Sequence, residues 1–371
     1  MNTFRKAVLK FAGMLALALA AAAVSPGALA QNERKLPSPN GKILFQSTQG
    51  SDNFVNEIYT MDEDGKHQVR LTYNEFDDAS PVWSPQGDRI AFISRRSDAG
   101  YEIYLMNPDG TGERKLRDAN QGGPLITNNI QWSPDGRRIM YNVGGKISVV
   151  EVTAPDGTFS NAPVQNLSAA TDFPYDSDAV WSNDGSQIAF VSMSCPACFS
   201  DLYVINLDGT GRKQLTTTTD AESGPTWTPT GRIAYSSFRG GGVNTYMIKA
   251  DGTEDQLLTG AVQDASNPVW SPDGSRLLFT SSGPAAAPRR GIYSMNADGS
   301  GLTFLTDEAN GGGKVFWAPD GSKVIAHTVN GANCIDVIAI DVNNAKNRVT
   351  NLTKTRKADE FAWSWQRVQT Q

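Results

Sequence analysis

Short apolar segments alternate with turn signals along most of the chain. Around Trp270, an apolar segment ends at the tryptophan (PVW), the turn SPDG follows, and three more short segments come after it, RLLFTS, IYSMN and LTFLT. Proline presets φ at the second position of such a turn and glycine closes it, while ADGSG at 297–301 contains the Asp-Gly pair that favours a hairpin. The pattern therefore predicts four antiparallel strands in this unit.

The same unit is written seven times along the chain. The tryptophan and its turn recur as WSPQGDRIAFIS, WSPDGRRIMYNV, WSNDGSQIAFVS, WTPTGRIAYSS and WAPDGSKVIAHT. A degenerate copy, WSWQRV, lies near the end of the chain. The fourth segment of each unit ends in a tag such as RLT at 70–72 or NLT at 351–353, and seven tags match seven tryptophans. Neighbouring tryptophans of the series are 43 to 49 residues apart, at Trp83, Trp132, Trp181, Trp227, Trp270, Trp317 and Trp363. A period in the forties with strand-like content indicates the blades of a propeller.

The two ends of the repeat are out of phase. The first unit starts at GKILFQS, residues 41–47, with no tryptophan strand before it, and the last tryptophan strand, EFAWSWQRV, has no blade after it. We expect the C-terminal strand to complete the first blade, because closure leaves no unpaired edge. The predicted fold is all-β, a single seven-bladed propeller of four-stranded blades, with six blades as the alternative. Each tryptophan is then expected in the core between neighbouring blades, with sugar stacking as the alternative role.

The first 30 residues differ in character from the rest. Residues 1–10 carry three positive charges, FAGMLALALAAAAV is an apolar run, and SPGALA ends in a small-residue cleavage pattern. These features predict a secretory signal peptide over 1–30, cut after Ala30, with a membrane anchor as the alternative. Residues 31–39 would then form a linker to the propeller at 40–371. The mature chain is expected in the periplasm, or alternatively outside the cell, without stable membrane insertion.

Composition and charge narrow the class of partner. Apolar residues make up 39% of the chain and charged residues 19%, which is typical of a globular protein with ample material for a core. The formal charge of −6 becomes −9 when Arg5, Lys6 and Lys10 leave with the signal peptide. Because nucleic acids and anionic membranes select basic patches, this balance excludes both and favours cationic partners or divalent metals.

The repeated sequence motifs resemble those of a known protein family. W-S-P-D-G-x-x-I/L-A-F-x-S, followed by E-I-Y-x-M-N-x-D-G-T-G and x-x-L-T, is similar to the TolB-type propeller repeat, also described as a WD40-like Pro-Asp repeat, over residues 40–368. The resemblance implies a propeller. TolB itself has an α/β domain ahead of a six-bladed propeller, whereas only residues 31–39 precede the first strand here. An envelope lipoprotein as partner is a further implication of the resemblance. Similar repeats occur in scaffold proteins, peptidase propeller domains and sugar-active enzymes, so the fold does not assign the function.

The loops that lead into the tryptophan strands are acidic. In a propeller, the turns after the first and third strands share one face, and the loops after the second and fourth strands share the other. The acidic loops should therefore gather around one mouth of the central channel. The acidic residues are Asp77, Asp78, Asp172, Asp176, Asp178, Asp220, Glu222, Asp264, Asp307, Glu308, Asp359 and Glu360. The second-strand loops of the same face add Arg95, Arg96, Arg239, Arg289 and Arg290.

Two hypotheses compete for this acidic mouth. Aspartates commonly cap turns and accept hydrogen bonds from backbone amides, and arginines near them can simply offset their charge. Alternatively, the carboxylates form a binding rim for a cationic segment of a partner, or hold Ca²⁺ with oxygen ligands, while arginines grip partner carboxylates. The candidate binding residues are Asp77, Asp78, Asp176, Asp178, Asp220, Asp264, Asp307, Asp359, Arg96 and Arg239.

The positions of the cysteines and histidines in the sequence do not favour a catalytic or metal site. Cys195 and Cys198 form C-P-A-C in a second-strand loop, and an adjacent-pair disulfide is expected in an oxidising compartment. Cys334, three blades away, is expected to stay reduced. A thioredoxin-like role would require a βαβ setting that the strand pattern does not provide. The two histidines, His67 and His327, fall in different units, which disfavours a Ser-His-Asp triad and a multi-histidine metal site.

The sequence favours an exported, non-enzymatic scaffold that binds a protein or peptide at the acidic mouth. It is expected to be a monomer without a cofactor, apart from the Ca²⁺ alternative. The competing hypothesis is a carbohydrate-active enzyme, a glycosidase or lyase, that uses carboxylates in the same mouth.

Overall fold

A computed structural model of the chain describes most of the sequence after residue 39. The described residues are 40–50, 55–97, 100–116, 130–153, 158–160, 162–168, 175–195, 198–307, 315–330, 332, 334–344, 349–355 and 357–368. They belong to one compact unit, Pro37–Gln371. The predicted signal peptide and linker lie outside the described residues. No helix in the described part of the chain is long and apolar enough to cross a membrane.

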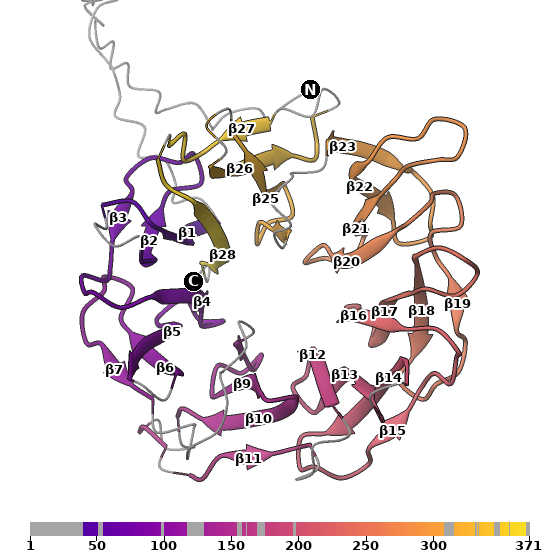
Figure 1. Cartoon of the computed structure of the whole chain (residues 1–371), viewed down its shortest axis with the longest axis horizontal. Coiled ribbons are helices and arrows are strands. Elements are labelled where there is room, and N and C mark those ends of the chain that lie inside the picture. Colours follow the sequence, from indigo (N-terminus) through magenta and orange to yellow (C-terminus); the bar gives the residue numbers. More distant parts are fainter. Residues whose placement is uncertain are drawn as a thin grey trace, which may run out of the picture. The chain divides into compact units, whose positions relative to one another are not determined.

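The compact unit is a ring of seven four-stranded antiparallel sheets, so the seven-bladed prediction is confirmed and the six-bladed alternative is wrong (Figure 1). Each blade is given below from its innermost strand outward. Blade one comprises β28 (Glu360–Arg367), β1 (Asn40–Ser47), β2 (Glu57–Met61) and β3 (Val69–Arg70). Blade two comprises β4 (Asp78–Trp83), β5 (Ile90–Ser97), β6 (Gly100–Met106) and β7 (Arg114–Lys115). Blade three comprises β8 (Gln131–Trp132), β9 (Arg138–Val143), β10 (Lys146–Glu151) and β11 (Gln165–Asn166).

The remaining blades follow in chain order. Blade four comprises β12 (Tyr175–Trp181), β13 (Gln187–Met193), β14 (Ser200–Asn206) and β15 (Lys213–Gln214). Blade five comprises β16 (Glu222–Trp227), β17 (Arg232–Ser237), β18 (Asn244–Lys249) and β19 (Gln256–Leu257). Blade six comprises β20 (Ser266–Trp270), β21 (Arg276–Ser281), β22 (Gly291–Asn296) and β23 (Thr303–Asp307). Blade seven comprises β24 (Phe316–Trp317), β25 (Lys323–Val329), β26 (Ile335–Asp341) and β27 (Val349–Asn351).

The C-terminal strand closes the ring, as the phase of the repeat predicts. β28 pairs antiparallel with β1, with Asn40 opposite Arg367 and Ser47 opposite Glu360. The first and last strands of the propeller thus share one sheet, and closure satisfies two edges that would otherwise be open to other chains.

The repeated SPDG turn has a local physical cause. In blade six, the Ser271 hydroxyl donates to Asp273 and accepts the amide of Arg276 at 2.9 Å, and the amide of Gly274 donates to the Ser271 carbonyl. Gly274 has φ of 70°, a value that a residue with a side chain adopts only at a cost. Serine, aspartate and glycine at this spacing therefore make a tight connection between the first and second strands.

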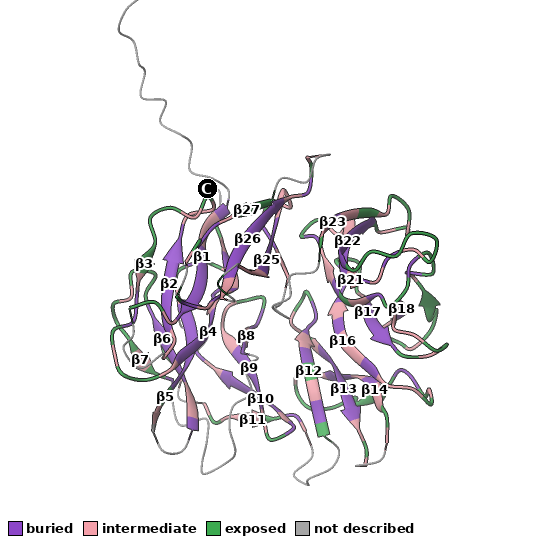
Figure 2. Ribbon diagram, turned by 45° about the horizontal axis from the view of Figure 1, so that its top comes forward, coloured by how far each residue is buried: buried purple, intermediate pink, exposed green. Residues whose placement is uncertain are grey.

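The core lies between neighbouring blades. One cluster joins blades one and seven, including Ile43, Phe45, Ile325 and Trp365. Figure 2 shows the buried residues concentrated in the strands and the exposed ones in the turns and loops. The interior is thus a set of contacts between adjacent sheets around the ring.

One tryptophan of the series stands two residues from its expected place. Trp83 pairs with Ile90 and Trp317 with Val324, and the residue that pairs with the equivalent Ile43 is Trp365, not Trp363. Trp365 is buried and Trp363 is only half-buried. The series therefore ends at Trp365, and six of its seven members are buried, Trp270 being the exception.

Candidate functional site

The described residues of the acidic loops lie on one face of the propeller. The loops between the second and third strands of a blade, and those from a fourth strand to the next innermost strand, form what we call the variable face. The opposite face, with the SPDG and Asp-Gly turns, is the turn face. Each innermost strand therefore starts at the variable face, and its tryptophan lies near the turn face.

A bulge interrupts several innermost strands three residues before the tryptophan. In blades two, four, five and six, the residues there are Ser80, Asp178, Gly224 and Asn267, with φ between 51° and 56°. The strand pairing shifts register at each of these points. A positive φ is costly for residues other than glycine, and such strain often accompanies function. Asp178 and Asn267 are exposed at this position, and the Asp178 carboxylate accepts the amide of Gly224 from the next blade at 3.2 Å.

Carboxylates five residues before the tryptophan are buried and serve the fold. Asp78, Asp176 and Glu360 have no exposed surface, and Glu222 is 1% exposed. Asp78 accepts from the Asn74 side chain at 2.7 Å, and Glu222 accepts from Ser237 at 3.0 Å. These four carboxylates of the predicted rim hold loops to strands. In the described structure they have almost no surface that a binding partner could contact.

A threonine of the repeated tag holds these buried carboxylates, and the sequence analysis did not assign it a role. The Thr216 hydroxyl accepts the amide of Leu202 at 2.8 Å and donates to Glu222 at 3.2 Å. Thr72 accepts the amide of Ile58 at 2.9 Å in the same way. The tag serine of blade three, Ser168, donates to Asp176 at 2.7 Å. The recurring pattern of a Leu-Thr tag, an acid about six residues on and a tryptophan five residues later could have shown the pairing.

Replacing Thr216 with valine should therefore lower the free energy of unfolding by about 1 to 3 kcal/mol. Valine has nearly the same shape but leaves the buried amide of Leu202 without its side-chain acceptor and removes one of the hydroxyl donors to Glu222. Thr216→Ser keeps the hydroxyl and should retain most of the stability. Urea denaturation of the three proteins measures the difference, and equal losses in both variants would show that the methyl group, not the hydroxyl, matters.

The predicted arginines are bound within their own blades. Arg96 forms ion pairs with Asp78 and Glu113, and its guanidinium lies 4.4 Å from the Tyr104 ring centroid. Arg239 pairs with Asp255 at 2.7 Å and lies 3.6 Å from the ring centroid of Tyr246.

Two further arginines follow the same arrangement. Arg212, which the sequence analysis did not single out, makes two hydrogen bonds to the buried Asp176. Arg289 pairs with Asp307. The fixed arginines therefore neutralise some carboxylates of the variable face, and Arg95 and Arg290 are exposed beside them.

The other predicted carboxylates differ in how they are held. Asp77 accepts from the Asn56 amide at 2.9 Å and from the Tyr101 hydroxyl, and Asp359 accepts the amide of Ile335 at 2.9 Å. Asp264 is exposed and accepts from the Ser282 hydroxyl at 2.9 Å. Asp220 is half-buried. Asp172 and Glu308 lie outside the described residues.

Burial raises the pKa of several buried carboxyl groups. Desolvation raises the pKa of Glu57, Asp78 and Glu222 above the ordinary range, against hydrogen bonds and neighbouring charges that lower it. The same burial raises the pKa of Glu360 to about 7, with the nearby Asp336 adding to the rise. These groups are costly to ionise where they stand.

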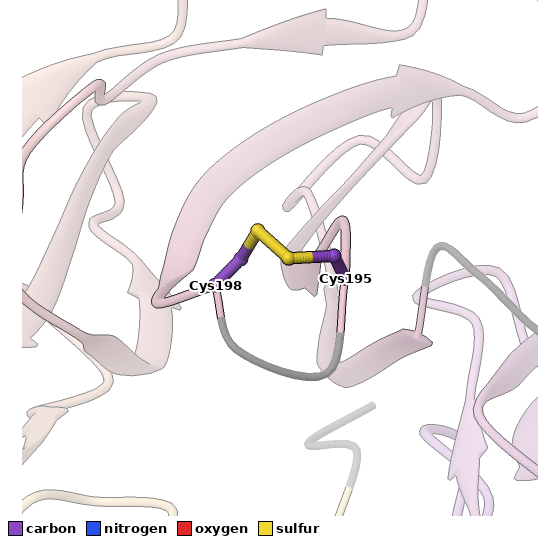
Figure 3. Close-up of a disulfide and its surroundings, with 2 residues drawn as sticks. All are labelled: Cys195 and Cys198. Carbon is purple, nitrogen blue, oxygen red and sulfur yellow. A yellow bond between two sulfur atoms is a disulfide. The ribbon is translucent and has the colours of Figure 1, made fainter.

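Cysteines and histidines are dispersed over the fold. Cys195 and Cys198 are joined by a disulfide in the loop between β13 and β14, with their Cα atoms 5.1 Å apart (Figure 3). Cys334 is a free thiol in blade seven. His67 is exposed on the turn face beside Asp62, and His327 is buried on β25, where its Nε2 accepts the amide of Ala362 at 2.9 Å. The two histidines belong to different blades.

The described residues contain no group of three or more His, Cys, Asp or Glu side chains arranged to hold a metal ion. Ca²⁺ at the acidic mouth stays a prediction that the structure does not test.

Comparison with known proteins agrees with the architecture. The family model described as "TolB beta propeller domain" matches residues 98–367. Among curated proteins, the chain is 26% identical over 194 residues to "Uncharacterized peptidase YuxL" of Bacillus subtilis, covering 51% of this chain and 26% of that protein. It is 35% identical over 104 residues to "Tol-Pal system protein TolB" of Gluconobacter oxydans, covering 25% of this chain and 21% of that protein. The matched region is about a quarter of the length of these relatives.

Solved structures share the fold at low identity. TolB from Acinetobacter baumannii superposes with a TM-score of 0.54 at 14% identity, covering 88% of this chain and 66% of that one. An oligogalacturonate lyase in complex with manganese gives a TM-score of 0.62 at 15% identity, covering 84% of each chain. At these identities the likeness extends to the fold alone.

Proposed function

The chain belongs to the TolB β-propeller domain family, and we propose that its variable face binds a protein or peptide partner without catalysing a reaction. The observation that carries this proposal is a set of carboxylates that form no ion pair with the lysines and arginines the structure describes. Among the described residues, no lysine or arginine lies within ion-pair distance of Asp178, Asp220 or Asp264. Asp176 and Asp307 on the same face do have such partners.

Unpaired surface carboxylates attract cationic groups and speed the encounter with a basic partner. Asp178 and Asp264 both have a positive φ, at 51° and 52°, so the fold holds them in a conformation that aspartate adopts at a cost. A rigid ring that displays fixed charges is suited to docking. We place this activity in the periplasm, with an envelope lipoprotein as the partner class that the resemblance to the TolB-type repeat implies.

The carbohydrate-active alternative has less support from the described side chains. Carboxylates do occur in pairs, such as Asp201 with Glu222, which share the Thr216 hydroxyl. A glycosidase needs both members of its pair to reach the sugar. Glu222 is almost fully buried, so this pair suits loop anchoring better than hydrolysis.

Site-specific photocrosslinking tests the proposal. A photoreactive phenylalanine analogue is placed at Asp264 on the variable face and, as a matched control, at the exposed Asp251 on the turn face. Each full chain is irradiated in an envelope extract of the source cell. We expect a discrete protein adduct from position 264 only, and we expect its yield to fall when Asp178 and Asp220 are also changed to asparagine.

Adducts of equal yield from both faces, or none from position 264, would contradict the proposal. Incubation with oligogalacturonate, followed by ultraviolet absorbance of the unsaturated product, examines the enzymatic alternative. Product formation by the wild-type chain would replace the scaffold role with a lyase.

A further inference from the structure

Aromatic side chains are exposed mainly on the variable face. Of the six aromatic side chains that are exposed in the described part of the chain, five lie on this face: Tyr73, Phe76, Tyr175, Phe199 and Phe238. Phe199 is 58% exposed and Phe238 is 48% exposed. A phenylalanine that is half open to water, with no role in the core, gains free energy if a partner covers it. Single exposed apolar residues are ordinary, so the argument depends on whether these lie together.

Hydrogen bonds tie the backbone at Phe238 and the residue next to Phe199 to the start of β16. Ser200, the neighbour of Phe199, donates its hydroxyl to the Glu222 carbonyl at 2.7 Å. Phe238 donates its own amide to the Ala221 carbonyl at 3.1 Å. The two phenylalanines therefore flank residues 221–222 from either side, one from blade four and one from blade five.

Tyr175 is exposed at the same end of blade four, with its ring close to Gly145 of blade three. It pairs with Met193 of β13, and Met193 pairs with Ser200 of β14, so the three residues form one row at the variable-face end of the blade. The disulfide between Cys195 and Cys198 fixes the loop immediately before Phe199 (Figure 3). We call Tyr175, Phe199 and Phe238 the aromatic surface; all three are exposed, and the strand pairings place them at one end of two adjacent blades.

Among the described residues, the charged side chains around the aromatic surface that form no ion pair are acidic. Asp178 follows Tyr175 on β12, Asp220 precedes the start of β16, and an added Cβ at Gly242, four residues after Phe238, would lie 3.4 Å from the Asp264 carboxylate. The nearby cations are neutralised, since Arg212 is paired with Asp176 and Arg239 with Asp255. Anionic lipid headgroups and acidic sugars would be repelled here, whereas lysine and arginine would be attracted.

We propose that the aromatic surface receives a partner segment in which a bulky apolar side chain stands next to lysine or arginine residues. The apolar side chain covers Phe199 and Phe238, and the cations meet Asp178, Asp220 and Asp264. Aromatic residues within a polar surround are the usual energetic centre of a protein interface. This inference rests on the proposed function and assigns it a location, blades four and five, and a partner chemistry.

The test uses synthetic peptides as probes and the full chain as receptor. A fluorescein-labelled peptide with two phenylalanines among lysines and glycines is compared with one that has serine in place of phenylalanine and one that has glutamate in place of lysine. Fluorescence anisotropy gives Kd for the wild type, for Phe199→Ser with Phe238→Ser, and for Asp178→Asn with Asp220→Asn and Asp264→Asn. Matched controls are Leu257→Ser with Val349→Ser on outer strands, and Asp109→Asn with Asp208→Asn and Asp251→Asn on the turn face.

We expect only the lysine-phenylalanine peptide to bind, and about a tenfold or greater rise in Kd for each variable-face variant. The controls should bind like the wild type. If the carboxylate variant alone weakens binding, the aromatic surface is not the anchor, although the proposed protein binding stands. If no peptide binds the wild type while the crosslink at position 264 persists, the partner chemistry is wrong. Binding of oligogalacturonate that depends on Phe199 and Phe238 would assign the surface to sugar stacking and overturn the inference.

Discussion

Replacing Trp365 with alanine should lower the free energy of unfolding by about 3 to 5 kcal/mol, the usual cost of removing a buried tryptophan. Trp365 is 8% exposed and lies in the cluster that joins the first and last blades, with Ile43 and Ile325. Its indole N–H donates to the Gly41 carbonyl at 3.1 Å. Because β28 closes the ring by pairing with β1, a cavity here weakens the packing that holds the C-terminal strand in the first blade.

Trp363→Ala is the matched control for this prediction. Trp363 lies on the same strand, two residues away, and is only half-buried, so its replacement should cost less than half as much. Urea denaturation followed by circular dichroism measures both variants. Equal costs would contradict the assignment of Trp365 as the seventh member of the series.

The displacement from Trp363 to Trp365 shows a limit of repeat-based reasoning. In the other six units, a Gly-containing turn after the tryptophan marks its position, whereas WSWQRV offers two tryptophans and no turn. Only the pairing with Ile43 distinguishes them. The ring closure itself was predictable, because it follows from counting strands at the two ends and does not depend on register.

The acidic residues show a second limit. Asp176 and Asp178 are two residues apart and would share a face in a regular strand. The shift of register between Ser177 and Val180 breaks that alternation, and so Asp176 is buried while Asp178 is exposed. A bulge of this kind depends on contacts with the next blade, such as the one from Gly224, and those contacts are not visible in the local sequence.

The exposed aromatic residues were not selected from the sequence for a related reason. Phe199 and Phe238 are 39 residues apart and belong to no repeated motif. Their proximity arises from hydrogen bonds that tie two loops to one strand. Which residues outside the repeat lie near one another can therefore be seen only in the assembled ring.

Replacing Glu360 with glutamine should make the protein more stable than the wild type at high pH, by a margin that grows by about 3 kcal/mol between pH 4 and pH 8. The folded chain holds the pKa of Glu360 at about 7 because the carboxyl is buried and lies near Asp336. A pKa raised by folding adds stability that is complete below the unfolded value near 4.5 and is lost as pH rises through 7. Glutamine cannot ionise, so the variant escapes that loss.

His327 opposes this trend in the wild type. Burial lowers the pKa of His327 to about 4, from an ordinary value of 6.5. A histidine with a depressed pKa adds stability that is complete above 6.5 and is lost as pH falls toward 4. Glu360 is the first residue of the closing strand and His327 accepts a hydrogen bond from it, and their contributions to stability have opposite slopes between pH 4.5 and 6.5. The wild-type profile should therefore be flatter in this window than either group alone would make it.

The variants separate the two slopes. With Glu360→Gln, only the histidine remains of this pair, and the free energy of unfolding relative to the wild type should rise from pH 4.5 to 6.5. With His327→Gln, only the carboxyl remains, and the free energy of unfolding relative to the wild type should fall over the same range. Exposed aspartates with lowered pKa, such as Asp109 and Asp208, weaken all three proteins alike in acid, so they cancel when each variant is compared with the wild type. Urea denaturation at half-unit steps of pH measures the profiles. Parallel profiles for the wild type and Glu360→Gln would mean that Glu360 ionises as easily in the folded ring as in the unfolded chain.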